Sequence, residues 1–131
     1  MIVVDASVLS VALGDDGTDG AAARAAIAGE TLTAQELLDL EVLSVWRRQV
    51  AAGHMTAGRA ELAIADLVTI PLRRVSHRPL IDRCWELRLT VTAYDAAYIA
   101  LAEILAVPLL TADARLSRAP GLRCQVDLLV R

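Results

Sequence analysis

The segment Ile2-Val3-Val4-Asp5-Ala6-Ser7-Val8 decides the fold, because a short apolar run ends there in a carboxylate. Its three consecutive β-branched residues predict a strand with both faces buried. The residues after Asp5 begin a helical pattern that continues to about Leu13. A strand that leads into a helix opens a parallel βαβ unit, and ligands of parallel sheets bind at the carboxyl ends of the strands. The segment therefore predicts a parallel α/β fold with a candidate site at Asp5.

Apolar runs and amphipathic segments alternate along the rest of the chain. Residues 68–75 contain Pro71 and predict less regular structure. With no repeat and no linker, the 131 residues predict a single domain, 1–131, built as a three-layer α/β/α sandwich around a central parallel sheet of about four to five strands. We expect the later strands at 31–34, 90–92, 108–111 and 124–126, and helices at 21–28, 36–52, 56–67, 79–89 and 95–105, with a short one ending near 117.

The composition indicates a globular protein of a reducing compartment. Hydrophobic residues make up 56% of the chain, which favours a filled core. The longest apolar stretch, 98–110, is interrupted by Glu103 and Pro108 and is too short to cross a membrane. No basic segment precedes the first apolar run, so we expect no signal peptide. Cys84 and Cys124 form no Cys-x-x-Cys pair and are expected to be core thiols in the cytoplasm.

The charge pattern excludes several enzyme classes. Residues 1–41 contain eight acids and one arginine, whereas residues 42–94 contain eight arginines and four acids, and the chain has no lysine. P-loop, Schiff-base and receiver-type phosphate sites each need a lysine, so none of them is expected. An aspartyl phosphatase is disfavoured as well, because Asp5-Ala6-Ser7 lacks a second aspartate.

Four acidic residues stand where a solvated charge is not expected: Asp5, Glu41, Asp95 and Asp113. Asp5 and Asp113 follow apolar runs, Asp95 opens a helix, and Glu41 has mainly apolar neighbours on its helical face. Carboxylates gathered in one crevice repel one another and need a cation. Oxygen ligands select Mg²⁺ or Mn²⁺, and neither His54 nor His77 has the spacing of a metal ligand. Ser7 and Thr111 are candidates to orient waters or the carboxylates.

Other interpretations of these residues stay open. Asp5 and Asp113 are also suited to cap the helices that follow them, and Thr92-x-x-Asp95 fits a capping box. Glu41 could pair with an arginine, and Ser7 and Thr111 could make ordinary local hydrogen bonds. If all four acids had such structural roles, the protein would be a non-catalytic interaction module.

The four acidic motifs resemble those of the PIN domain, and within it of the VapC-type toxins of VapBC toxin–antitoxin systems. The resemblance is carried by residues 2–8, 40–48, 92–103 and 108–116 and covers essentially the whole chain. It implies an endoribonuclease dependent on Mg²⁺ or Mn²⁺, with an auxiliary hydroxyl at Thr111. It further implies a cytoplasmic homodimer, a VapB antitoxin, and tRNA, rRNA or mRNA as substrate. A PIN nuclease of RNA processing is the alternative. The acidic quartet of the family falls on Asp5, Glu41, Asp95 and Asp113.

The nuclease hypothesis assigns roles to further residues. We expect Asp5, Asp95 and Asp113 to ligate the ion directly, with Glu41 as a further ligand or as the group that positions water. Hydrolysis would then leave a 5′-phosphate and a 3′-hydroxyl. Tyr94 and Tyr98 could stack on bases or could pack in the core or a dimer. The candidates for holding RNA phosphates are Arg47, Arg48, Arg73, Arg74 and Arg78, with Arg83 and Arg88 beside them.

Overall fold

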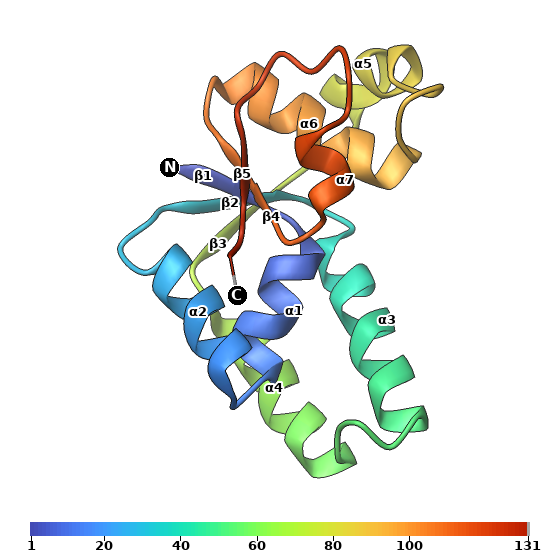
Figure 1. The fold of residues 1–131 in the computed structure, drawn as a ribbon. Helices are drawn as coiled ribbons and strands as arrows, with labels where there is room; N and C mark the ends of the chain where they lie inside the picture. Colours follow the sequence, from blue (N-terminus) through green and yellow to red (C-terminus); the bar gives the residue numbers. More distant parts are fainter. Residues whose placement is uncertain (131) are drawn as a thin grey trace.

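A computed structural model of the protein describes residues 1–130, and five of its segments form one sheet in which all neighbouring strands are parallel (Figure 1). The strand order is β3-β2-β1-β4-β5. The strands are β1 (Ile2–Val4), β2 (Leu32–Gln35), β3 (Leu72–Val75), β4 (Leu109–Thr111) and β5 (Val126–Leu128). The predicted α/β fold with a central parallel sheet is therefore confirmed.

Strand β1 lies at the centre of this sheet. Val3 pairs with Thr33 of β2 on one side and with Leu109 of β4 on the other. Val3 and Val4 are fully buried, which agrees with the unbroken apolar run in the sequence. The chain builds β2 and β3 outward on one side and β4 and β5 on the other, so the direction of winding reverses between β1 and β4. In a parallel sheet that reversal opens a crevice at the carboxyl ends of the two strands.

Helices cover both faces of the sheet, as Figure 1 shows. The core is accordingly split: Ile2 and Val4 pack in one cluster and Val3 in the other, as expected from the alternation of side chains along a strand. Helices α1 and α2 lie on one face and α5 and α6 on the other, while α3 and α4 project together beyond the sheet. Their bounds are α1 (Ala6–Gly14), α2 (Thr18–Ile27), α3 (Leu38–Ala51), α4 (Ala57–Thr69), α5 (Ile81–Glu86), α6 (Ala93–Leu105) and α7 (Ala114–Ser117), with a 3₁₀ turn, η1 (Arg78–Leu80), before α5.

One close contact fixes α3 against α1. Trp46 of α3 is almost completely buried, and its indole nitrogen donates to the Ser10 carbonyl at 3.1 Å. Gly14 at the end of α1 permits this approach, because a Cβ at that position would lie 2.6 Å from the Trp46 nitrogen. The contact holds the helix that carries Glu41 next to the helix that follows Asp5.

Two expectations about the strands were wrong. Residues 90–92 form a turn in which Thr90 and Thr92 are exposed, because no neighbouring strand is there to pair with them. Residues 72–75 form a regular strand at the sheet edge, because Pro71 precedes the strand instead of interrupting it. The fifth strand lies at 126–128, two residues later than expected, and the helix expected at 79–89 is divided into η1 and α5.

Neither the two cysteines nor the two histidines are fully buried. Cys84 and Cys124 are half-buried free thiols packed against the main core. His54 is exposed in a loop, whereas His77 is half-buried. Within residues 1–130, no helix has the length and apolar character needed to cross a membrane.

Candidate active site

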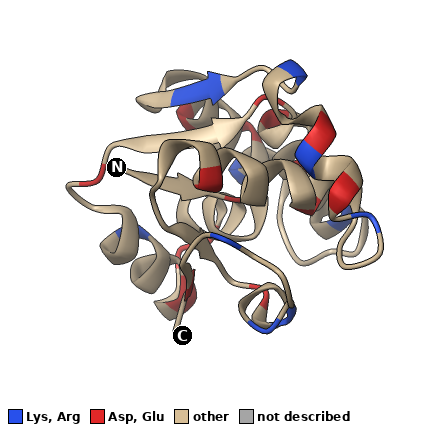
Figure 2. Ribbon diagram, turned by 90° about the horizontal axis from the view of Figure 1, so that it is seen from above, with Lys and Arg blue, Asp and Glu red and all other residues tan. Residues whose placement is uncertain are grey.

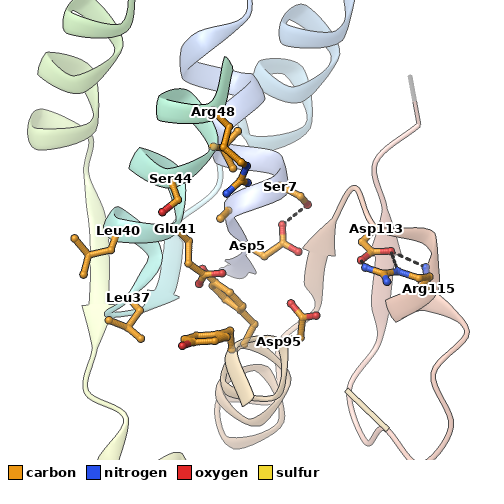
Figure 3. A pocket seen from close by; sticks show the side chains of 14 residues that line it. Asp5, Ser7, Leu37, Leu40, Glu41, Ser44, Arg48, Asp95, Asp113 and Arg115 are labelled. Atoms are coloured by element: carbon orange, nitrogen blue, oxygen red, sulfur yellow. Dashed lines mark hydrogen bonds and ion pairs between the residues drawn. The ribbon is translucent and has the colours of Figure 1, made fainter. Parts of the chain in front are cut away.

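A pocket of about 690 Å³ lies at the carboxyl ends of β1 and β4 (Figure 3). The four acidic residues singled out in the sequence all line it. Asp5 follows β1, Asp113 follows β4, and Asp95 and Glu41 lie in the first turns of α6 and α3. The reversal of winding in the sheet thus brings together residues that are up to 108 positions apart in the chain.

Asp5 is the most buried of the four, with 4% of its surface exposed. One carboxylate oxygen accepts from the Ser7 hydroxyl at 2.5 Å and from the Val8 backbone at 3.2 Å, and the other accepts from Thr111 Oγ1 at 2.5 Å. Asp5 therefore caps α1, which was the alternative role considered from the sequence, and it also lines the pocket. Burial raises the pKa of Asp5 despite these hydrogen bonds, and the charge of Asp95 raises it further.

The two hydroxyls that hold Asp5 are themselves held by the backbone. Ser7 Oγ accepts from the Ala112 amide at 2.9 Å, and Thr111 Oγ1 accepts from the Asp113 amide at 3.1 Å. Each hydroxyl thereby links the carboxylate of Asp5 to the turn after β4. Ser7 and Thr111 orient a carboxylate, which is one of the two roles proposed for them from the sequence.

Glu41 is bound by neutral groups. Its Oε1 accepts from Gln35 Nε2 at 2.7 Å and from the Tyr98 hydroxyl at 2.9 Å. The expectation that an arginine could neutralise Glu41 was wrong, because both partners are uncharged. Burial raises the pKa of Glu41, and the charges of Asp95 and Asp5 raise it further.

Tyr98 packs in the core and is 1% exposed, so the base-stacking alternative is wrong for this residue. Burial and the neighbouring Glu41 carboxylate raise the pKa of Tyr98, so its phenol remains protonated and donates. Tyr94, in contrast, is exposed and lines the pocket.

Sequence reasoning missed Gln35 and its link to His77. Gln35 is completely buried at the end of β2, and its Oε1 accepts from the Leu37 amide at 2.7 Å. That bond identifies the oxygen of the side-chain amide, so the nitrogen must face Glu41. His77 Nε2 lies 2.6 Å from the same oxygen and must therefore carry the proton. The only signal in the sequence was a polar residue at the end of an apolar strand.

Asp95 and Asp113 lie in different surroundings. Burial raises the pKa of Asp95, and so does the charge of Asp113. The Arg115 guanidinium binds Asp113 through two contacts, at 2.7 and 3.1 Å, and holds the pKa of that carboxyl below its usual range. Figure 3 shows Asp113 turned toward Arg115, while Asp5, Glu41 and Asp95 point into the same hollow. Arg115 is a second residue that sequence reasoning missed, although it lies only two positions after Asp113.

The side chains that line the pocket fit a hard divalent cation by type. Its titratable donors are carboxylates, and no histidine or cysteine lines it in the described chain. The raised pKa values of Asp5, Glu41 and Asp95 reflect burial and mutual repulsion, both of which a cation would relieve. Within residues 1–130, however, no three metal-binding side chains are already close enough together to hold an ion. The tight convergence of all four carboxylates that the sequence predicted is therefore incomplete.

The five arginines predicted to contact RNA are scattered. Arg48 lines the pocket, whereas Arg47, Arg73 and Arg78 are exposed outside it. Arg74 binds both oxygens of Asp39, at 2.7 and 2.9 Å, which gives it a structural partner. Figure 2 shows basic residues on several separate elements, β3 among them.

A five-stranded parallel sheet with an acidic pocket at the reversal between β1 and β4 defines an α/β protein of the open, parallel-sheet class. The PIN domain family model matches residues 2–122. The chain is 41% identical over 127 residues to ribonuclease VapC1 of Mycobacterium tuberculosis, covering 96% of each protein, and 38% identical over 131 residues to ribonuclease VapC9 of the same organism, covering 100% of each. It therefore belongs to the PIN domain family, in its VapC branch.

Solved structures agree with this fold. Mycobacterium tuberculosis VapC20, described as a toxin that cleaves the sarcin–ricin loop, superposes with a TM-score of 0.71 at 17% identity, covering 93% of this chain and 96% of that one. VapBC2 from Rickettsia felis, bound to a DNA fragment from its promoter, superposes with a TM-score of 0.64 at 14% identity, covering 99% of this chain and all of the other.

Proposed function

We propose that the protein is an endoribonuclease toxin of a VapBC system that hydrolyses RNA phosphodiester bonds with Mg²⁺ or Mn²⁺. The observation that carries the proposal is the pocket at the end of β1 and β4, which four carboxylates from separate segments line in a VapC-type chain. Such a site suits phosphoryl transfer to water, because a divalent ion held by carboxylates activates water and stabilises charge on the phosphate.

The residues of the pocket then have distinct roles. Asp5, Asp95 and Asp113 hold the ion, and Glu41 is a further ligand or positions water. Ser7 and Thr111 fix the orientation of Asp5. Gln35 and Tyr98 both bind Oε1 of Glu41, and among the described residues no hydrogen bond occupies Oε2, which is therefore available to the ion or to water.

Two arginines of the pocket support substrate binding. Arg48 and Arg115 line it together with the carboxylates. Arg48 has no ion-pair partner in the described part of the chain, whereas Arg115 shares its charge with Asp113. Guanidinium groups bind phosphate through paired hydrogen bonds, so these two residues are placed to hold the phosphates of the RNA beside the carboxylates.

The partners belong to the same proposal. The Rickettsia felis neighbour is a VapBC complex, and this supports a VapB-type antitoxin for the present chain. A cytoplasmic homodimer is a further part of the proposal. Large apolar side chains are exposed on α3 and α4, among them Leu40, Leu62 and Val68, at 60%, 65% and 75% of their surface. Such uncovered apolar surface is typical of protein–protein contacts.

The decisive experiment is cleavage of RNA by purified protein with Mn²⁺, with and without a chelator. We expect cleavage that the chelator abolishes and that Asp5→Asn lowers by at least about a hundredfold, the scale of one charged group acting at a reacting centre. Asp66→Asn is the matched control, because Asp66 is exposed on α4 and lines no pocket described above. Undiminished cleavage by Asp5→Asn would refute the role given to Asp5, whereas a wild type without cleavage and without a saturable Mn²⁺ site would favour the non-catalytic interaction module.

A further inference from the structure

A second pocket, of about 460 Å³, adjoins the acidic one. Leu37 and Tyr94 line both pockets, so the two pockets are neighbours on the surface. Its size lies within the usual range of small-molecule sites, about 300 to 1,000 Å³. The pocket lies between the end of β2, helix α5 and the start of α6. The proposed hydrolysis of RNA at the carboxylates does not use it.

The walls of this second pocket include two exposed aromatic rings and lack acids. Trp85 of α5 and Tyr94 of α6 both line it and are 67% and 55% exposed. In the described chain, no aspartate or glutamate lines it, in contrast to the four in the acidic pocket. Exposed rings in a cavity without acidic groups favour a flat aromatic ligand.

Cations lie at its rim. The Arg88 guanidinium stacks on the Trp85 ring, 4.6 Å from the centroid. A third hollow, of about 640 Å³, shares Arg88 with the aromatic pocket and shares Asp95, Asp113 and Arg115 with the acidic pocket. The three hollows therefore form one connected surface on which arginines flank the carboxylates and the aromatic rings lie to one side.

We infer that the pocket formed by Trp85 and Tyr94 binds an unpaired nucleobase of the RNA strand whose phosphate lies at the carboxylates. The inference rests on the proposed function and extends it to the substrate class, single-stranded RNA with an unstacked base beside the cleaved bond. Continuity with the acidic pocket places the ligand next to the reacting phosphate. The two aromatic rings and the absence of acids suit the base, and the arginine-lined hollow suits the phosphates that continue from it.

Binding of short single-stranded RNA in the presence of a chelator tests this inference without cleavage. The probes are the four homopolymers and an abasic ribose–phosphate chain of equal length, which keeps the phosphates and lacks the bases. We expect Trp85→Ala to weaken binding of at least one homopolymer by about fivefold or more, the lower end for loss of one stacked base. Trp85→Phe should retain most of the affinity, and the abasic chain should bind the wild type and Trp85→Ala equally.

Leu62→Ala is the matched control, because Leu62 is as exposed as Trp85 and lies on α4 outside all three hollows. The inference is overturned if Trp85→Ala binds every probe as Leu62→Ala does, or if the abasic chain loses as much affinity as the homopolymers. It is also overturned if Trp85→Ala converts a dimer to a monomer in light scattering, because the face would then be a subunit contact. A wild type that binds RNA with base preference and never cleaves it would refute the proposed nuclease and leave the base pocket standing.

Discussion

The hydroxyl of Thr111 offers the sharpest test of how the site is held, because a second buried threonine serves as its control. Thr111 is fully buried, donates to Asp5 at 2.5 Å and accepts from the Asp113 amide at 3.1 Å. Thr33, one strand away from β1, is equally buried, and within residues 1–130 its hydroxyl has no hydrogen-bond partner. Valine has the shape of threonine without the hydroxyl, so both changes preserve volume.

The two substitutions should have opposite effects. A hydrogen bond to a charged group contributes about 1.5 to 3 kcal/mol, so Thr111→Val should lower the free energy of unfolding by about 2 kcal/mol at neutral pH. Thr33→Val removes a buried hydroxyl that makes no bond and should be neutral or stabilising by up to about 1 kcal/mol. Urea denaturation of both variants and of the wild type, without added metal, measures these differences.

The pH dependence follows from the charge of Asp5. Burial raises its pKa in the folded protein, so the carboxylate opposes folding above its unfolded pKa and this cost disappears when the group is protonated. Loss of the Thr111 hydroxyl affects the charged form most, so the destabilisation by Thr111→Val should shrink as the pH falls through the raised pKa. Equal losses for the two valine variants, or a loss for Thr111→Val that is constant with pH, would refute this account of the site.

Three further predictions concern neighbouring groups. Glu41→Gln should raise the melting temperature of the metal-free protein at neutral pH, because the raised pKa of Glu41 shows that its charge is unfavourable in the folded protein. This increase should vanish at acidic pH, and a lower melting temperature at neutral pH would contradict the prediction. Mn²⁺ should raise the melting temperature of the wild type at neutral pH. This increase should become smaller as the pH is lowered, because the raised pKa values of Asp5, Glu41 and Asp95 let protons compete with the ion. An equal increase at acidic pH would count against carboxylate ligands. Gly14→Ala should lower the free energy of unfolding by about 1 to 3 kcal/mol in urea, because the new Cβ overlaps Trp46, and an unchanged midpoint would show that α1 and α3 shift apart easily.

The strands that the sequence predicted correctly are those whose burial is complete. Val3 and Val4 are surrounded on both faces, and an unbroken apolar run is the direct consequence. Residues 90–92 have a similar β-branched character, but Thr90 and Thr92 are exposed and no strand pairs with this segment, so local preference alone was misleading. Pro71 was read as an interruption because the sequence does not say on which side of a proline an edge strand begins.

The candidate site shows the same division. A charged residue beside an apolar pattern can be recognised from the sequence alone, and this identified Asp5, Glu41, Asp95 and Asp113. The bond of Gln35 to Glu41 depends on the turn between β2 and α3, and the bond of Gln35 to His77, 42 positions away, depends on the pairing of β2 with β3, which no local pattern reports. The ion pair of Asp113 with Arg115 is local, yet it competes with the predicted role of Asp113, and only the geometry reveals which interaction forms.

The placement of the four carboxylates has an evolutionary consequence. All four depend on the three inner strands: Asp5 and Asp113 follow β1 and β4, the helix bearing Asp95 packs against these strands, and the helix bearing Glu41 follows β2. The outermost strands, β3 and β5, bear none of them. Descendants of such a chain can therefore diversify along both flanks of the molecule, and so acquire new targets, while the chemistry at its centre is inherited unchanged.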